Sequence, residues 1–290
     1  KTYPEIPKYL ILIIIVILLI SYLISYFYSL RKINIKDILR YNNYINLDHS
    51  TEDIKEITEN DLKIFVNNIY FSKFKENKGG MEAPDLFTLW FILNKYKPKV
   101  VIESGVWNGL STLLIRKTLP NCKIICLDPR DIPENGYKDN NVNTSYYLGN
   151  NFIDFGNLDI SNYNPNDILC FFDCHQNAYF RLLQCINKNI NKVFLNDNYP
   201  VNCGSHYTIE HLKNNDNRLY SIDENNKQKL LNKITNYHIF PNIYPGKIKT
   251  GEGYFDCNSF FKENNDIDYL SIFREERNSY RWNTFISLNI

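Results

Sequence analysis

The sequence predicts an α/β domain with a doubly wound, mostly parallel seven-stranded sheet, preceded by one transmembrane helix. Two observations predict this architecture. Apolar, strand-like runs alternate with helix-like runs along most of the chain, which is the pattern of a parallel sheet covered by helices on both faces. Near the N-terminus, residues 9–28 form an apolar run without a single charge.

The composition is that of a folded globular protein. The chain has 290 residues, with 33 basic and 32 acidic side chains, and this balance argues against an electrostatic nucleic-acid binder. A hydrophobic content of 44% and a charged content of 22% exclude wholesale disorder. The seven cysteines lack the paired spacing of a structural zinc site, so we expect free thiols in a reducing compartment.

The apolar run is long enough to be a membrane anchor. As a helix that rises ~1.5 Å per residue, residues 9–28 would span a hydrocarbon core of ~30 Å. A cleaved signal peptide would have a shorter apolar core followed by small residues. Basic residues outnumber acidic ones directly after the run, and the positive-inside rule therefore favours a single-pass protein with a cytoplasmic C-terminal domain.

We expect three segments: an anchor with its flanks at 1–32, a stem with one helix at 33–80, and an α/β domain at 81–290. The predicted strands are 99–103, 123–128, 145–148, 167–173, 192–196, 237–241 and 284–288. The predicted helices are 61–74, 82–96, 110–119, 176–189 and 207–213.

A glycine turn follows the first predicted strand. The segment from Glu103 to Ser111 reads E-x-G-x-x-x-G-x-S and leads into a helix. Gly105 allows a tight turn, Gly109 allows a ligand to approach closely, and the helix start offers free N–H groups to polar ligand atoms. The spacing is neither that of a dinucleotide fold nor that of a phosphate-binding loop. The next strand ends in Asp128, where a carboxylate can accept hydrogen bonds from ribose hydroxyls.

Together, KVVIESGVWNGLST and IICLDPRD resemble motifs I and II of class I S-adenosylmethionine-dependent methyltransferases. The resemblance covers about residues 81–290 and implies a Rossmann-like fold that binds S-adenosylmethionine. It places Glu103, Gly105 and Gly109 along the methionine and ribose of the cofactor, Asp128 on the ribose, and Trp107 and Ser111 at the carboxylate end.

Two further strands end in acidic residues, Asp173 and Asp197, and Asn198 follows the second. The carboxyl ends of parallel strands meet at one edge of a sheet, so these side chains should face one crevice. Two carboxylates and an amide oxygen are ligands that suit Mg²⁺. The structural alternative is that both acids only cap loops and helices.

The pattern also resembles the metal-dependent O-methyltransferases of the catechol and macrolide-sugar types, which implies Asp173, Asp197 and Asn198 as ligands of Mg²⁺ or another divalent cation. The chain departs from both types after Asp173, where it has His175 and Gln176. This leaves the general base open, with His175 and then His206 as the candidates.

The function expected is methyl transfer to a hydroxyl of a sugar, a glycan or another small polyol. One alternative is a catalytically inactive, membrane-tethered binding or structural module. Another is a methyltransferase-like fold used for different chemistry, such as hydroxylation or metal-free transfer. Two insertions would cover the site: residues 201–236, which are rich in asparagine and lysine, and residues 243–282, which contain several aromatic residues. We interpret the basic and aromatic run at 274–282 as a solvated helix end.

Overall fold

The structure is a computed structural model, and it describes residues 57–70, 80–201, 203–216, 219–250, 253–257, 259–261 and 270–290. The expected anchor at 9–28 lies outside these residues. Among the described residues, no helix is long and apolar enough to cross a membrane. Residues Ser50–Ile290 form one compact unit.

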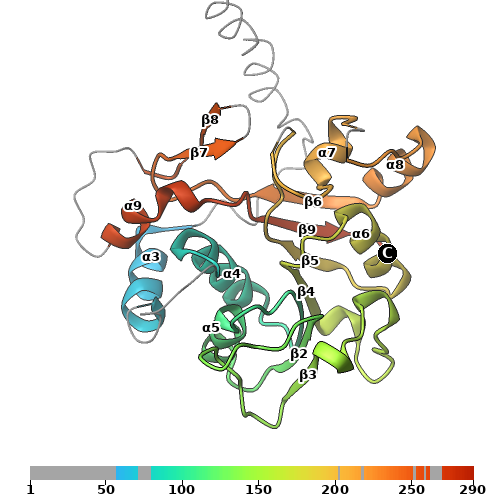
Figure 1. Ribbon diagram of the computed structural model, residues 1–290, viewed down its shortest axis with the longest axis horizontal. Helices are drawn as coiled ribbons and strands as arrows, with labels where there is room; N and C mark the ends of the chain where they lie inside the picture. The colour runs from blue at the N-terminus through green and yellow to red at the C-terminus, as the bar shows by residue number, and fades with distance from the viewer. Residues whose placement is uncertain are drawn as a thin grey trace, which may run out of the picture. The chain divides into compact units, whose positions relative to one another are not determined.

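The domain is built on a seven-stranded sheet in the order β3-β2-β1-β4-β5-β9-β6 (Figure 1). Its strands are β1 (Val100–Ser104), β2 (Lys123–Asp128), β3 (Thr144–Leu148), β4 (Ile168–Phe172), β5 (Lys192–Leu195), β6 (Ile234–Ile239) and β9 (Thr284–Leu288). Strands β1 to β5 are parallel, whereas β9 is antiparallel to both β5 and β6. The strand order reverses direction between β1 and β4, which is where ligands bind in open α/β sheets.

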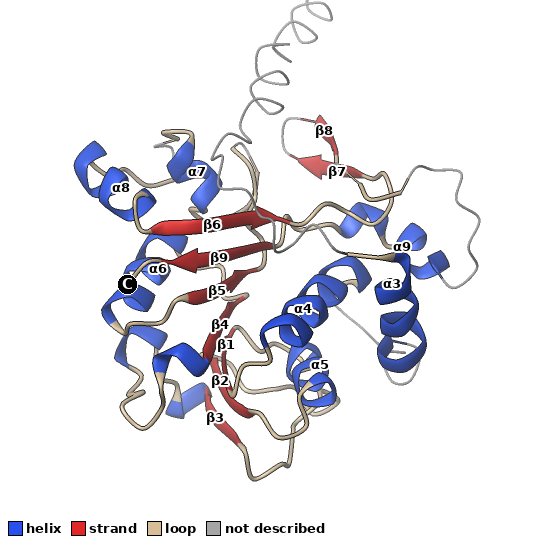
Figure 2. Cartoon of the chain, turned by 180° about the vertical axis from the view of Figure 1, so that it is seen from behind, coloured by secondary structure: helices blue, strands red, loops and turns tan. Residues whose placement is uncertain are grey.

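Helices cover both faces of this sheet, so the fold is doubly wound (Figure 2). One face carries α3 (Glu59–Phe65), α4 (Ala83–Tyr96), α5 (Leu110–Thr118) and α9 (Ser271–Glu275), and the other carries α6 (Ala178–Asn187), α7 (Ile209–Lys213) and α8 (Glu224–Leu231). All five residues of β1 and of β4 are therefore buried, as their continuous apolar runs predict.

Successive side chains of each strand enter opposite cores. In β1, Val101 packs with α4 and α5, whereas Ile102 packs with α6. In β4, Phe171 belongs to the same core as Val101, and Phe172 belongs to the same core as Ile102. The sheet thus separates two apolar layers, and its edges are the places where polar side chains can gather.

The predicted strands and the helix at 82–96 are confirmed, with boundaries that differ by up to three residues. The helix expected at 61–74 begins earlier, because Thr58 and Asp61 form a capping box, and after Phe65 it continues as a π-helical turn, Val66–Tyr70. This part of the expected stem is packed into the core of the domain through Leu62 and Phe65.

Three elements were not predicted. They are the short helices α8 and α9 and the hairpin formed by β7 (Lys247–Thr250) and β8 (Gly253–Asp256). All three belong to the polar insertions around the last strands, where the sequence has little apolar periodicity.

Candidate active site at the carboxyl edge of the sheet

The glycine turn after β1 is required by close contacts within the protein. Gly105 has φ +97°, and a Cβ there would lie 2.2 Å from the carbonyl oxygen of Asp173. Gly109 has φ +81°, and its Cβ would lie 2.0 Å from the carbonyl oxygen of Tyr137. Gly105 therefore holds the turn against the end of β4. At Gly109, where the sequence predicts the close approach of a ligand, the backbone of the loop after β2 makes that approach.

Glu103 lies beneath this turn and is completely buried. Its carboxylate accepts hydrogen bonds from Ser111, from Thr112 Oγ1 at 2.6 Å and from Cys126 Sγ at 3.4 Å. Burial raises the pKa of Glu103 to about 7, although the hydrogen bonds from Ser111 and Thr112 oppose this shift. Glu103 and Ser111, which the resemblance places on the cofactor, bind each other and join β1 to α5.

Asp128, the last residue of β2, binds the backbone of the same turn through its side chain. Its Oδ2 accepts the backbone N–H groups of Val106 at 2.9 Å and Trp107 at 3.1 Å, and its Oδ1 accepts that of Arg130 at 2.9 Å. Burial alone would raise the pKa of Asp128, but these three hydrogen bonds outweigh it and the pKa is lowered. A carboxylate offers about four acceptor positions, and the fourth, on Oδ1, accepts Arg130 Nε at 3.5 Å, the longest of these contacts.

Arg130 and Trp107 cover that fourth position. The guanidinium lies over the Trp107 ring at 4.6 Å, and its Nε is 3.5 Å from Asp128 Oδ1. Both side chains are more than one third exposed, so the cover can move. A ribose hydroxyl could reach Asp128 only after Arg130 moves aside.

A second group of side chains gathers at the ends of β4 and β5. Asp173, His175 and Asp197 each offer one ligand atom, and these atoms lie within 4.8 Å of one another. His175 Nε2 is 2.6 Å from Asp197 Oδ2, and Asn196 Nδ2 donates to Asp173 Oδ1 at 2.9 Å. The two predicted carboxylates therefore meet, and His175 joins them.

The two carboxylates differ in their electrostatic environment. Burial and the neighbouring Asp197 raise the pKa of Asp173 to about 7. Burial also acts against the charge of Asp197, but hydrogen bonding to His175 and the nearby Arg281 cation keep its pKa below the usual value. Asp197 Oδ1 is buried, receives no hydrogen bond from the described residues, and lies 3.6 Å from Arg281 Nε.

His206 stacks on His175, with ring centroids 5.4 Å apart and an interplanar angle of 20°. Both rings line a small cavity of about 20 Å³ together with Asn196 and Asp197. Burial lowers the pKa of His206 to about 4, so its imidazole is neutral at neutral pH. Its Nδ1 is buried and receives no partner from the described residues.

Asn198, the third ligand expected from the sequence, turns away from this group. Its Nδ2 donates to Tyr237 Oη at 2.7 Å and to Thr284 Oγ1 at 2.9 Å, and its Oδ1 accepts the N–H of Ile209 at 3.1 Å. The amide therefore joins β5 to β6, β9 and α7, and its oxygen is already used within the protein.

The sequence did not indicate Asn196 or Arg281 as members of the site. Asn196 is followed directly by Asp197 and Asn198, so its place in this polar run did not distinguish it as a site residue. Arg281 precedes β9, and an antiparallel strand begins at the edge where the parallel strands end, as the pairing of Leu195 with Thr284 shows. An antiparallel orientation assigned to the last strand would have indicated Arg281 as a member of the site.

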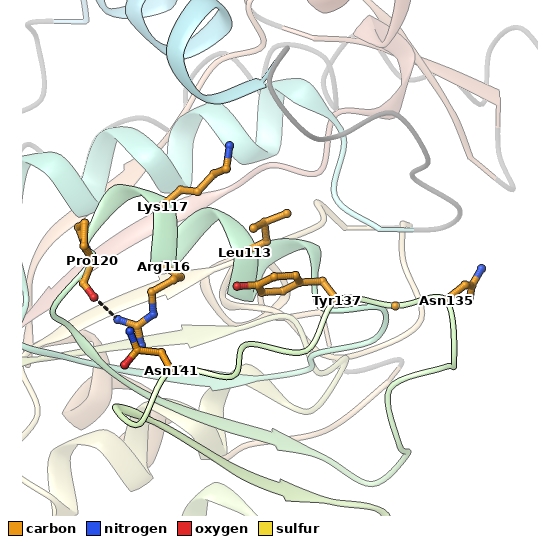
Figure 3. A pocket seen from close by; sticks show the side chains of 8 residues that line it. Leu113, Arg116, Lys117, Pro120, Asn135, Tyr137 and Asn141 are labelled. Carbon is orange, nitrogen blue, oxygen red and sulfur yellow. Dashed lines mark hydrogen bonds between the residues drawn. The ribbon is translucent and has the colours of Figure 1, made fainter.

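A larger hollow of about 670 Å³ lies beside α5 (Figure 3). Arg116 and Lys117 are the charged residues that line it. On the Arg116 wall, the guanidinium already binds Asp139, Thr144 and three carbonyl oxygens, including that of Pro120 at 2.6 Å. The hollow therefore has little free binding capacity on that wall, and the candidate site remains the carboxyl edge of the sheet.

No family model and no curated protein matches the chain. Solved structures that resemble it include three methyltransferases. The O-methyltransferase TomG of Streptomyces achromogenes, solved with S-adenosylmethionine, is 10% identical, with 82% of this chain and 93% of that chain covered and a TM-score of 0.41. An O-methyltransferase of Bacillus cereus, solved with S-adenosylhomocysteine, is 10% identical, with coverage of 85% and 99% and a TM-score of 0.38. A methyltransferase of Podospora anserina is 13% identical, with coverage of 72% and 92% and a TM-score of 0.36. At these identities and scores, the similarity does not establish a function for this chain.

Proposed function

We propose that this protein is an S-adenosylmethionine-dependent O-methyltransferase that acts on a small molecule with neighbouring hydroxyls, such as a sugar, a glycan or another polyol. One observation carries the proposal. The Gly105 turn, Asp128 and the Asp173–His175–Asp197 group lie side by side at the carboxyl edge of one sheet, next to its topological switch point. The turn contacts Asp128 through Val106 and Trp107, and it contacts Asp173 through Gly105.

The cofactor side has the polar groups that a nucleoside needs. Gly109 gives α5 no side-chain cap, so the first N–H groups of this helix can receive polar ligand atoms. A ribose hydroxyl would take the acceptor position on Asp128 Oδ1 that Arg130 Nε holds at 3.5 Å. When bound here, S-adenosylmethionine would supply an electrophilic methyl group. The chain holds the cofactor and keeps the turn rigid through Glu103.

The acceptor side has the charge for a divalent cation, Mg²⁺ in the simplest assignment. Asp173 and Asp197 would hold it, and the buried Oδ1 of Asp197, which lacks a hydrogen-bond donor among the described residues, fits a cation. Such an ion lowers the pKa of a hydroxyl bound to it. We assign proton acceptance to the neutral His206, which lines the cavity beside His175.

A polyol acceptor is supported by the chemistry of the same edge. Two neighbouring hydroxyls can bind one cation together, and the half-buried ring of Tyr199 lies beside His206, while the buried Trp282 packs against Tyr199. Aromatic rings offer a surface for the apolar face of a sugar. The cavity is small, so acceptor binding requires the loop that carries His206 to move outward.

Calorimetry with S-adenosylhomocysteine tests the proposal directly, because binding of this product does not require the acceptor. We expect one site per chain, and we expect Asp128→Asn to weaken it by about tenfold or more, since the amide loses an acceptor position and a charge-assisted hydrogen bond. Asp159→Asn is the matched control, because Asp159 is exposed and its side chain binds Ser161 in a loop after β3.

Absence of binding to the wild-type chain, with and without a divalent cation, would refute the proposal. It would favour a binding or structural module without catalysis. That alternative has its own support, because the protein itself occupies all four acceptor positions on Asp128, the fourth through Arg130 Nε at 3.5 Å.

A further inference from the structure

We infer that the metal site at the ends of β4 and β5 selects a transition-metal dication, such as Fe²⁺, Co²⁺ or Zn²⁺, over Mg²⁺, because His175 Nε2 joins Asp173 and Asp197 as a ligand. This inference rests on the proposed function for the role of the ion, but not for its binding. Imidazole nitrogen suits the later first-row metals, whereas Mg²⁺ prefers oxygen ligands alone.

The distances between the three ligand atoms suit one ion. They lie within 4.8 Å of one another, and His175 Nε2 is 2.6 Å from Asp197 Oδ2. Around an octahedral ion with bonds of about 2.1 Å, adjacent ligand atoms are about 3 Å apart and opposite ones about 4.2 Å. Small side-chain adjustments would therefore bring all three atoms onto one centre.

The backbone directs His175 toward this centre. His175 has φ 52° and Asp197 has φ 56°, so both residues adopt the left-handed conformation although neither is a glycine. Residues other than glycine keep this conformation only where the surrounding structure holds them in it. The two turns bring the imidazole back over the end of β5, where it meets the Asp197 carboxylate.

Two buried oxygens provide independent support for a bound cation. Asp197 is 4% exposed and Asn196 is 8% exposed, and the Oδ1 atom of each receives no hydrogen bond from the described residues. Both residues line the same cavity as His175. Arg281 Nε lies 3.6 Å from the Asp197 oxygen, beyond hydrogen-bond distance, whereas a bound cation would satisfy both oxygens.

Asn198 does not complete an all-oxygen site, because its side-chain oxygen accepts the N–H of Ile209. The donor set that remains is two carboxylates and one imidazole. His206 lies behind His175 in a stacked arrangement and can keep the ligand ring in place.

The test uses the full chain, stripped with a chelator and then dialysed against Zn²⁺, Co²⁺ or Mg²⁺. Bound metal is measured by elemental analysis, and the visible absorption spectrum of Co²⁺ reports its ligands. We expect Zn²⁺ and Co²⁺ to bind at least about tenfold more tightly than Mg²⁺. We also expect His175→Ala to weaken Co²⁺ by about tenfold or more and to change its spectrum. Gln228→Ala is the control, since Gln228 is exposed on α8 and does not line this cavity.

The inference is overturned if Mg²⁺ binds as tightly as Co²⁺, if the wild-type chain retains no dication, or if His175→Ala binds Co²⁺ with wild-type affinity and spectrum. Asp173→Asn serves as a second ligand variant if His175→Ala does not fold, and it should lose Co²⁺ as well. Binding of S-adenosylhomocysteine is measured separately. Loss of that binding alone refutes the proposed function, whereas loss of metal selectivity alone refutes this inference.

Discussion

The polar side chains at the strand ends fall into two groups that have different roles. Glu103 and Asn198 direct their polar atoms at other parts of the protein and hold elements together. Asp173, His175 and Asp197 face one another instead. Asp128 belongs to both groups, because it binds the turn and its Oδ1 also meets the exposed side chain of Arg130.

Glu103 should make the stability of the domain depend on pH. Its pKa is raised from 4.5 to about 7 in the folded protein, so the folded state holds the proton more tightly than the unfolded state. The resulting stabilisation is fully present below pH 4.5 and is lost as the pH rises to about 7. We expect this group to lower the free energy of unfolding by about 3 kcal/mol over that range.

Urea unfolding at several pH values measures this effect. Glu103→Gln cannot ionise, so its stability should fall less steeply than that of the wild type between pH 4.5 and 7. The exposed Glu134 provides the control variant, Glu134→Gln. Parallel curves for the wild type and Glu103→Gln would show that Glu103 does not contribute the predicted dependence.

At the scale of elements, the structure explains which of them the sequence reveals. Strands β1, β2 and β4 each contain a continuous apolar run (residues 100–102, 124–127 and 168–172), because both faces of the sheet are covered. Helix α8 is the opposite case. It has eight residues, and Lys227 and Leu230 are its only buried ones, so it has no apolar periodicity to detect.

Helix α7 depends on Asn198 for its position. This helix has only five residues, and the Asn198 side chain accepts the N–H of Ile209 at its start while donating to Tyr237 and Thr284 in the sheet. We expect Asn198→Ala to lower the free energy of unfolding by about 2–4 kcal/mol, because three buried hydrogen bonds are lost.

Urea unfolding measures this loss, with Asn135→Ala in an exposed loop as the control. The folded Asn198→Ala protein should keep its affinity for Co²⁺, because the Asn198 oxygen does not face the carboxylates. A variant of normal stability that loses the metal would instead support the ligand role expected from the sequence.

At the scale of the whole molecule, the sheet separates two apolar cores. Ile124 in β2 belongs to the core under α4 and α5, and Ile286 in β9 belongs to the core under α6. Three strands lie between β2 and β9. Replacing either isoleucine with valine should cost about 1 kcal/mol, and the double variant should cost the sum, about 2 kcal/mol.

Urea denaturation of the two single variants and the double variant measures this additivity. The comparison is a pair of substitutions within one core, Ile124→Val and Val101→Ala, because these two residues are paired on adjacent strands. The loss of unfolding free energy in this double variant should differ from the sum of the two single losses. A strong coupling between Ile124 and Ile286 would mean that the two cores do not respond independently.

The amino-acid sequence by itself determined the order of strands and helices, the glycine turn after β1 and the acidic ends of β2, β4 and β5. These features are local, since hydrophobic period and turn chemistry depend on neighbouring residues. It also predicted that Asp173 and Asp197 meet, because parallel strands place their carboxyl ends at one edge.

Only the tertiary structure decided what each polar side chain binds. The Asn198 oxygen accepts the N–H of Ile209, His175 lies against Asp197, Arg281 approaches Asp197 from the start of β9, and Tyr137 fills the space expected for a ligand at Gly109. Each of these outcomes depends on which segment distant in the chain packs nearby. A hydrogen bond or an ion pair forms only when its partner arrives within about 3–4 Å, and no local pattern in the sequence contains that distance.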